Sequence, residues 1–326
     1  SILICAKNEA ENLKTFLPEI LDQNYPKFEV VLINDDSHDD TFEIMESFAS
    51  KHDNVKIVNV APNKAFLGNK KYALTLGIKA SKHEFLLLTD ADCKPNSKQW
   101  LKEMSSHFSN TKTIVLGYGA YSKINNSFLN KLIRFETVLT AIQYFSFSIA
   151  GIPFMGVGRN LAYRKDEFFN ANGFQNHMQI PSGDDDIFIN QVATDTNTAI
   201  CFTKNSFTIS NPKTSLRSWI TQKRRHISTA RHYQLKHKAL LTLFFISQFL
   251  FWILAFILLI SLFNWQITFV LIGIRFILFY VMFIPTLKKL DEKDLAIFLP
   301  FLEFFLIATQ LAIFITNLIT KPKHWK

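Results

Sequence analysis

A buried strand that ends in two carboxylates decides the fold: Phe85-Leu86-Leu87-Leu88-Thr89-Asp90-Ala91-Asp92. The continuous apolar run predicts a strand that is covered on both faces. Asp90 and Asp92 flank one small residue where this strand ends, and two carboxylates in that position can hold Mg²⁺ or Mn²⁺. Such a metal binds the phosphates of a nucleotide and neutralises a leaving diphosphate. A solvated loop is the alternative interpretation of Asp90 and Asp92.

Strands and helices alternate from Ser1 up to this stretch. Continuously apolar strands that alternate with helices predict a parallel sheet with helices on both faces. Polar clusters follow three of the strands, at the edge where ligands bind in such sheets: Lys7-Asn8-Glu9, Asn34-Asp35-Asp36 and Asp90-Ala91-Asp92. The predicted strands are Ile2–Ala6, Glu29–Ile33, Val55–Val60 and Phe85–Leu88, and the predicted helices are Asn8–Ile20, Thr41–Ser50 and Asn69–Ala80.

Two further residues of this region are candidates for binding a nucleotide. Asp35 follows a strand, and its carboxylate can accept hydrogen bonds from a base or a ribose. The alternative is that the same turn caps the next helix through Ser37 or Asp39, and both interpretations can hold at once. Lys70 begins a predicted helix and can meet a phosphate or a base, although a lone Lys is usually a surface residue.

Three adjacent carboxylates follow Gly183: Asp184, Asp185 and Asp186. Their mutual repulsion favours a raised pKa in at least one of them, or a nearby cation. A general base that deprotonates a sugar hydroxyl fits this cluster. An acidic helix start, stabilised by the helix dipole, is the alternative.

The positive charge of the chain is concentrated beside its apolar C-terminal part. The net charge is +9, and Asn211–Lys238 holds eight Lys or Arg residues and no Asp or Glu. Basic residues beside a membrane span mark its cytoplasmic side and attract anionic lipid headgroups, so we expect no nucleic-acid partner. Within this stretch Arg225 can meet a leaving diphosphate, or it can belong to a basic helix that faces the membrane.

The C-terminal part predicts a membrane anchor. Ala239–Ile274 contains no charged residue, and a bilayer core needs about 20 apolar residues per helix. The predicted spans are Leu240–Phe263, Gln266–Thr286 and Leu295–Ile319. Three crossings from a cytoplasmic domain would place the basic residues 321–326 outside. Either the third segment is re-entrant or this end departs from the positive-inside tendency.

Two charges lie inside the predicted spans, Arg275 and Glu303. A charge at the bilayer centre is costly unless it faces a protein interior or a wet cavity. We expect Arg275 and Glu303 to form an ion pair. The rival interpretation is that Arg275 binds a lipid phosphate. Upstream, Phe128–Ile149 predicts an amphipathic helix that lies in the membrane interface or in an ordinary core.

In order and spacing these motifs resemble the family-2 inverting glycosyltransferases, which have the GT-A fold. The resemblance covers about Ser1–Lys238, and the apolar tail agrees with the membrane-bound branch of that family. The matching elements are Asn8-Glu9, the turn Asn34–Thr41 with Asp35, Lys70 with Ala73, Leu74 and Gly77, the Asp90/Asp92 pair, Gly156–Arg164 with Gly158 and Asn160, the base motif Asp184-Asp185, and Gln222, Arg225 and His226.

Departures from the family pattern bear on the site. Asp36 replaces the Gly of the family turn and Asn34 replaces its first Asp. Asp184 replaces the usual Glu, and Asp186 allows the base to be displaced by one position. His226 stands where processive relatives carry a Trp at the acceptor site, which favours the addition of one sugar, or very few, per acceptor.

The resemblance implies a metal-dependent, inverting transfer from a nucleotide-sugar, a UDP-sugar, to a lipid or lipid-linked glycan. Asp185 would be the base, with Asp184 and Arg225 beside it in the catalytic set. Asp92 and Asp90 would hold the metal. Glu9, Asp35, Lys70, Asp90, Gly158, Asn160 and Gln222 would bind the donor.

The predicted domains are 1–125 for the nucleotide-sugar half, 126–238 for the acceptor half and 239–326 for the anchor. We expect an α/β GT-A domain facing the cytoplasm at a bacterial inner membrane, with a native N-terminal segment missing before Ser1. Cys5, Cys93 and Cys201 predict free thiols. The alternatives are a processive polysaccharide synthase and an inactive membrane scaffold.

Overall fold

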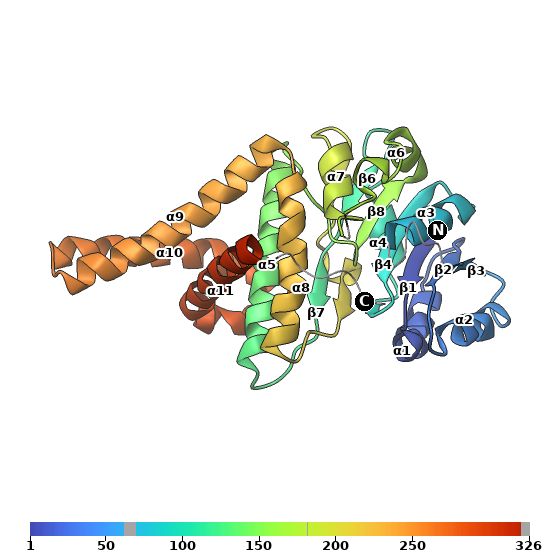
Figure 1. Cartoon of the computed structure of the whole chain (residues 1–326), viewed down its shortest axis with the longest axis horizontal. Helices are drawn as coiled ribbons and strands as arrows, with labels where there is room; N and C mark the ends of the chain where they lie inside the picture. The colour runs from blue at the N-terminus through green and yellow to red at the C-terminus, as the bar shows by residue number, and fades with distance from the viewer. Residues whose placement is uncertain (62–69, 181, 321–326) are drawn as a thin grey trace. The chain divides into compact units, whose positions relative to one another are not determined.

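The structure is a computed structural model, and it describes residues 1–61, 70–180 and 182–320. Figure 1 labels the helices and strands along the chain. The described residues form two compact units. Unit 1 comprises Ser1–Ser122 and Gln143–Pro212, and unit 2 comprises Lys123–Ile142 and the residues from Lys213 onward. Helix α5 (Phe128–Ile149) contributes its first part to unit 2 and its last part to unit 1.

A seven-stranded sheet lies in unit 1, with the strand order β3-β2-β1-β4-β8-β6-β9. β1 to β4 are parallel, β8 runs antiparallel to its neighbours β4 and β6, and β9 is parallel to β6. The predicted, mostly parallel sheet is therefore confirmed. The strands are β1 (Ile2–Ala6), β2 (Val30–Asp35), β3 (Val55–Val60), β4 (Phe85–Asp90), β6 (Ile114–Leu116), β8 (Leu161–Arg164) and β9 (Thr198–Ile200).

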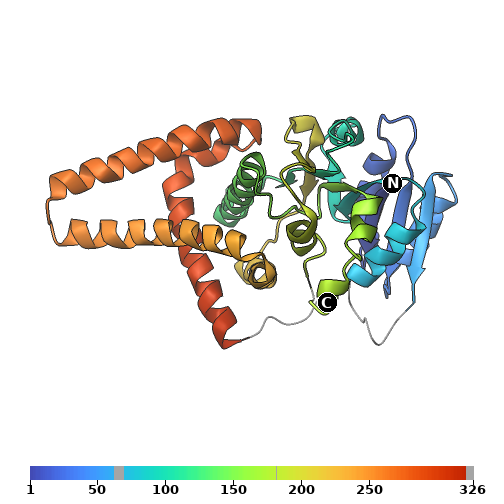
Figure 2. The ribbon, with the colours of Figure 1, turned by 90° about the horizontal axis from the view of Figure 1, so that it is seen from above.

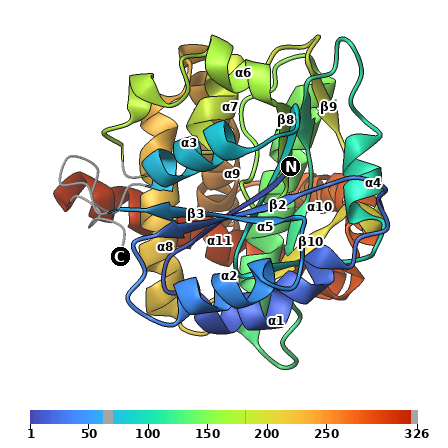
Figure 3. The ribbon, with the colours of Figure 1, turned by 90° about the vertical axis from the view of Figure 1, so that its right-hand side faces the viewer.

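Helices cover both faces of this sheet, as the alternating pattern predicts. Figure 3 shows α1 and α2 on one face and α3 on the other. Ile4 and Leu32 point to the first face, where they pack with Leu13 in the core. On the opposite face α3 approaches β2 so closely that a Cβ on Gly77 would lie 2.2 Å from Cδ1 of Ile33. The helices are α1 (Ala10–Leu21), α2 (Thr41–Ala49) and α3 (Lys70–Ala80).

The rest of unit 1 consists of short elements. A second sheet has the order β5-β10-β7, in which β10 is antiparallel to β5 and parallel to β7. These elements are β5 (Cys93–Pro95), β7 (Gly119–Tyr121), β10 (Thr208–Ser210), α4 (Trp100–Ser105), α6 (Lys165–Asn170), α7 (Asp186–Val192), η1 (Gln175–His177) and η2 (Lys204–Ser206). All three cysteines are free, as predicted.

Unit 2 is helical. Its elements after α5 are α8 (Leu216–Thr229), η3 (Ala230–His232), α9 (Leu235–Ile260), α10 (Trp265–Lys289), η4 (Lys293–Phe298) and α11 (Leu299–Ile319). The segments Leu235–Ile260, Trp265–Lys289 and Lys293–Ile319 are long and apolar enough to cross a membrane, in agreement with the predicted spans. Leu262 and Asn264 adopt positive φ angles of 52° and 43° in the turn between α9 and α10.

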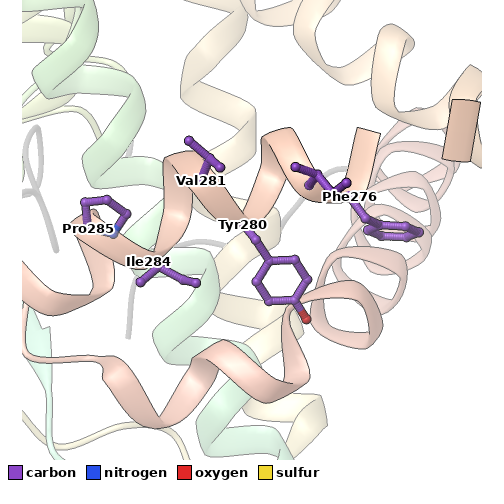
Figure 4. A pocket seen from close by; sticks show the side chains of 6 residues that line it. Phe276, Tyr280, Val281, Ile284 and Pro285 are labelled. Carbon is purple, nitrogen blue, oxygen red and sulfur yellow. The ribbon is translucent and has the colours of Figure 1, made fainter. Parts of the chain in front are cut away.

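A groove of about 530 Å³ lies on α10 (Figure 4). Its lining is apolar except for the Tyr280 hydroxyl, and it offers no carboxylate or basic group. The groove therefore lacks the groups that catalysis or metal binding would need. It is lined by Phe276, Ile277, Tyr280, Val281, Ile284 and Pro285.

Candidate active site

Two predicted site residues, Asp35 and Asp90, lie at one edge of the large sheet because the strands that carry them are in register. Cys5 of β1 pairs with Asp90 of β4, and Ala6 pairs with Asn34 of β2. Asp35 ends β2 and is 6% exposed. Burial raises its pKa above the ordinary value. The carboxyl ends of the parallel strands therefore place Asp35 and Asp90 at the same edge.

Lys70 joins two of the acidic motifs. Its Nζ lies 2.9 Å from Oδ1 of Asp90 and 2.9 Å from Oδ2 of Asp184. Burial opposes the charge on Lys70, but Asp184 and Asp90 outweigh it and raise the pKa of the ammonium well above its usual value. Burial likewise opposes ionisation of Asp184, and Lys70 overcomes it and lowers the pKa of that carboxyl. Lys70 and Asp184 are therefore both charged.

Asp185 is the N-cap of α7 and is held by two backbone donors. The N–H of Gly158 donates to its Oδ2 at 2.7 Å, and the N–H of Asp186 donates to its Oδ1 at 2.7 Å. Burial, and then the charges of Asp184 and Asp186, raise the pKa of Asp185 to about 7. The helix-cap and general-base interpretations are thus compatible, because the same side chain caps α7 and has the pKa that a base needs near neutral pH.

The loop before β8 packs against the carboxylate of Asp185. A Cβ on Gly158 would lie 3.3 Å from Oδ2 of Asp185, so a larger side chain here would press on the carboxylate. Asn160 is fully buried. Its Oδ1 accepts from Nε1 of Trp100 at 3.0 Å, and its Nδ2 donates to the carbonyls of Tyr118 and Ser206 at 3.0 and 2.7 Å. Asn160 therefore fixes the backbone of this loop, and donor binding by its side chain stays a prediction.

Lys71 is a site residue that the sequence interpretation missed. It is 1% exposed, and its Nζ donates to the carbonyls of His177, Ile180 and Ser182 at 2.8, 2.9 and 2.7 Å. These carbonyls belong to the segment that leads into Asp184. The signal was present in the helical spacing, since Lys71, Leu74 and Ile78 lie on the buried face of α3.

The Asp90 and Asp92 carboxylates suit a hard divalent cation. One ligand atom each from Asp90, Asp92 and Cys93 lies within 4.8 Å of the others. Burial raises the pKa of the Cys93 thiol well above its usual value, so this thiol is protonated and is a poor ligand. The remaining donors are carboxylate oxygens, which Mg²⁺ and Mn²⁺ prefer.

The turn after β2 links the starts of α1 and α2. The N-cap of α2 is Asp40, whose side chain makes no capping bond. Asp39, one residue earlier, accepts from the backbone N–H of Thr41 at 3.1 Å and of Ala10 at 3.3 Å, so its carboxylate binds the first N–H groups of α2 and α1. The N–H of Glu9 donates to Oγ1 of Thr41 at 2.8 Å, which places Glu9 beside this turn. Asp36 has a φ of 52°, a conformation that Gly adopts freely and that Asp tolerates. This explains how Asp36 replaces the Gly of the family turn.

Gln222 and Arg225 lie on α8 in unit 2, which Ser215 caps by accepting from the N–H of Ser218. Neighbouring basic residues fix this helix within unit 2. Nζ of Lys223 lies 2.5 Å from Oε2 of Glu136 on α5, and Arg224 binds residues at the end of α11. The roles of Gln222 and Arg225 at the donor diphosphate stay predictions.

Sequence comparison gives the family of a chain with this fold and this edge of carboxylates. The family model "Glycosyl transferase family 2" matches residues 1–169, which is over half of the chain. The chain therefore belongs to glycosyl transferase family 2. A structure of a mannosyltransferase from Pyrobaculum calidifontis with GDP-Man and Mn²⁺ superposes with a TM-score of 0.55 at 18% identity, and it covers 71% of this chain and 61% of that one. This likeness confirms the GT-A-type fold.

Curated relatives match shorter segments. The poly-beta-1,6-N-acetyl-D-glucosamine synthase of Staphylococcus epidermidis is 37% identical over 92 residues, which are 28% of this chain and 21% of that protein. Glycosyltransferase AglE of Haloferax volcanii is 33% identical over 119 residues, 36% of this chain and 38% of that protein. The matches thus span less than two thirds of the length of these relatives.

Proposed function

We propose that this chain is a membrane-bound, inverting glycosyltransferase that moves a sugar from a UDP-sugar to a hydroxyl of a lipid or lipid-linked glycan. One observation carries the proposal. Asp185, with a pKa raised to about 7, is held by the N–H groups of Gly158 and Asp186 beside the Lys70-bridged carboxylates Asp90 and Asp184. In a family-2 chain, a base in this position can deprotonate an acceptor hydroxyl for a direct displacement at the anomeric carbon of the donor sugar.

The reaction needs one proton transfer and one bond exchange. Asp185 takes the proton of the acceptor hydroxyl as its oxygen bonds to the anomeric carbon. The bond from that carbon to the diphosphate oxygen breaks on the opposite side, so the configuration inverts and the nucleoside diphosphate leaves with the electron pair. The two backbone donors fix the direction of the Asp185 carboxylate, which is the positioning that such a step requires.

A divalent metal ion and two basic side chains would act on the donor diphosphate. Asp92 and Asp90 would hold Mg²⁺ or Mn²⁺, which would supply charge stabilisation to the leaving diphosphate. Lys70 and Arg225 would add positive charge, with Glu9, Asp35, Gly158, Asn160 and Gln222 completing the donor site. The mannosyltransferase structure contains GDP-Man and Mn²⁺, which supports a metal-assisted nucleotide-sugar site.

The acceptor proposal follows from the anchor. Three helices are long and apolar enough to cross a membrane, and the basic α8 precedes them. We propose that residues 1–125 bind the donor, that 126–238 bind the acceptor, and that both face the cytoplasm at a bacterial inner membrane. The likeness to a poly-N-acetylglucosamine synthase favours a processive synthase as the second candidate. His226, in place of Trp, favours short products.

A screen of nucleotide-sugars, scored by release of the nucleoside diphosphate from purified protein, tests the proposal. We expect one UDP-sugar to give release that a membrane-lipid extract accelerates. Asp185→Asn should remove this activity, whereas Asp195→Asn, at an exposed residue of the same unit, should keep it. Release from no donor would contradict an enzyme and favour the scaffold. A long polymer on a sizing gel would favour the synthase.

A further inference from the structure

The third apolar segment, η4 and α11, is fixed at its start by a buried arginine. Arg134 on α5 is 2% exposed. Its Nε donates to Oε2 of Glu292 at 2.8 Å, and its Nη1 donates to Oδ2 of Asp294 at 2.9 Å. The same guanidinium therefore binds the residue before η4 and a residue within it. The segment begins against α5.

The end of the same segment is fixed by a second arginine. Nε of Arg224 on α8 donates to Oδ1 of Asn317 at 2.8 Å, and its Nη2 donates to the carbonyl of Thr320 at 2.7 Å. Nδ2 of Asn317 in turn donates a hydrogen bond to the carbonyl of Arg224 at 3.1 Å. The segment therefore ends against α8, a helix that is too polar to lie within hydrocarbon.

The two attachment points lie on helices that an ion pair joins to each other. Lys223, next to Arg224, forms an ion pair of 2.5 Å with Glu136, which is two residues from Arg134 on α5. A helix that crossed would deliver its two ends to opposite faces of the hydrocarbon core. The start and the end of η4–α11 are instead bound to α5 and α8, which are themselves joined by the Lys223–Glu136 ion pair.

Between its ends the segment reaches the middle of the hairpin formed by α9 and α10. Glu303 on α11 pairs with Arg275, which lies near the middle of α10 (Trp265–Lys289). Phe304 packs on Trp252 of α9, with ring centroids 5.3 Å apart. Figure 2 shows α11 running across α9 and α10 at a steep angle instead of along them. A helix that crossed beside a hairpin would run along it.

The outward side of α11 is apolar. Phe301 is 65% exposed, Phe314 56% and Leu318 72%, whereas Leu302, Glu303 and Leu306 on the other side are buried. Without lipid this side would be an unusually large apolar surface. Lys288, Lys289 and Lys293 lie where α10 meets η4, which is the charge pattern of a cytoplasmic boundary.

We propose that η4–α11 is a re-entrant segment that enters and leaves the membrane on the side of α8, so that only α9 and α10 cross. Its outward face binds the lipids of the leaflet on that side. The three arginine contacts hold its start, its deepest part and its end. Two crossings also remove the charge conflict that a third crossing creates in the sequence. The proposal does not depend on sugar transfer.

Labelling of single introduced cysteines in the full chain tests the proposal. The probes are Ile319→Cys at the end of α11, Lys293→Cys at the start of η4 and Phe263→Cys in the turn between α9 and α10, all at exposed positions. A membrane-impermeant maleimide is applied to sealed vesicles of both orientations, and labelling in detergent gives the total. The unaltered chain, in which Cys93 and Cys201 are buried, sets the background.

We expect Ile319→Cys to label from the same side as Lys293→Cys and from the side opposite to Phe263→Cys. Labelling of Ile319→Cys from the Phe263 side would overturn the proposal, because the segment would then cross. If Ile319→Cys does not label in detergent, Leu318→Cys, 72% exposed, answers the same question. The readout is independent of catalysis, so an inactive but folded chain still decides it.

Discussion

The backbone N–H of Gly158 donates a hydrogen bond of 2.7 Å to Oδ2 of Asp185, although 27 residues separate the two in sequence. The contact joins the loop before β8 to the N-terminus of α7. It explains why the family motif has Gly at position 158, since a Cβ would lie 3.3 Å from the same oxygen. The direction of the carboxylate is therefore set by backbone atoms.

Asp185→Asn should lower kcat by two to four orders of magnitude, roughly the usual contribution of a general base. The amide cannot take the acceptor proton, while KM for the donor should change little. Steady-state kinetics of nucleotide release measures both. Asp186→Asn is the comparison variant, because it removes the neighbouring carboxylate, whose Oδ1 accepts from the N–H of Ile187, and keeps Asp185. If Asp186→Asn is the more damaging change, the base lies one residue later.

The rate should rise with pH through about 7. Burial, together with Asp184 and Asp186, raises the pKa of Asp185 to about 7, and only the ionised carboxylate can accept a proton. At pH 5 about one molecule in a hundred would then carry the active form. A pH profile of kcat/KM checks this, and Asp185→Glu should retain a rising limb at a shifted midpoint. A rate that is flat between pH 5 and 8 would contradict Asp185 as the base.

Much of the fold of residues 1–94 could be predicted because the strands and helices there carry strong patterns. The predicted bounds of Ile2–Ala6 and Val55–Val60 are the observed ones. The predicted strands that precede Asp35 and Asp90 correspond to β2 and β4, which end in these two residues. The strands β5 to β10 were not predicted individually. Elements as short as Cys93–Pro95 and Ile114–Leu116 have three residues, too few for periodicity to separate strand from loop.

The missed residues are basic side chains that the fold buries. Lys71 was missed because a Lys next to Lys70 suggests a solvated helix start, and Arg134 because its partners Glu292 and Asp294 are far away in sequence. Such contacts depend on tertiary packing, which no local pattern encodes. The pair Arg275 and Glu303 was predicted, since a charge in an apolar span demands a partner.

Lys71→Met should lower both thermal stability and kcat. The substitution leaves the carbonyls of His177, Ile180 and Ser182 without their shared donor, and an unsatisfied buried group costs about 1–3 kcal/mol. The segment that leads to Asp184 would then be less well ordered. Lys79→Met is the control, as the same change at an exposed residue of the same helix. Equal effects of the two variants would contradict the positioning role.

Asp92→Asn and chelation with EDTA should each abolish turnover while the protein stays folded. Asp92 contributes one of two neighbouring carboxylates, and its amide is a weaker ligand for Mg²⁺ or Mn²⁺. Added Mn²⁺ should restore the EDTA-treated wild type but not the variant. Circular dichroism monitors the fold in both. Full activity in EDTA would eliminate the metal from the mechanism.

The ion pair between Arg275 and Glu303 joins α10 to α11, as the sequence predicts. Glu303 is 2% exposed, and the guanidinium carbon of Arg275 also lies 4.5 Å from the ring centroid of Phe251 and 4.7 Å from that of Phe279. The Glu303 carboxylate is therefore enclosed by protein, and the Arg275 guanidinium, whose side chain is 22% exposed, packs between these rings and the carboxylate. This geometry favours a structural pair over a lipid-phosphate site at Arg275.

Glu303→Leu should destabilise unit 2 by about 3–5 kcal/mol, the usual result of removing one partner of a buried pair, because Arg275 keeps a charge that no carboxylate balances. Arg275→Met should be costly for the same reason, while Arg275→Met/Glu303→Leu should recover much of the loss, since no charge remains enclosed. Thermal unfolding of the detergent-solubilised chain measures all three. Arg217→Met, the same change at an exposed arginine of α8, should leave the midpoint unchanged. A double variant that is no more stable than the less stable single variant would contradict the pairing interpretation. An Arg275→Met chain that keeps its midpoint of thermal unfolding but no longer uses a lipid acceptor would favour the lipid-phosphate site.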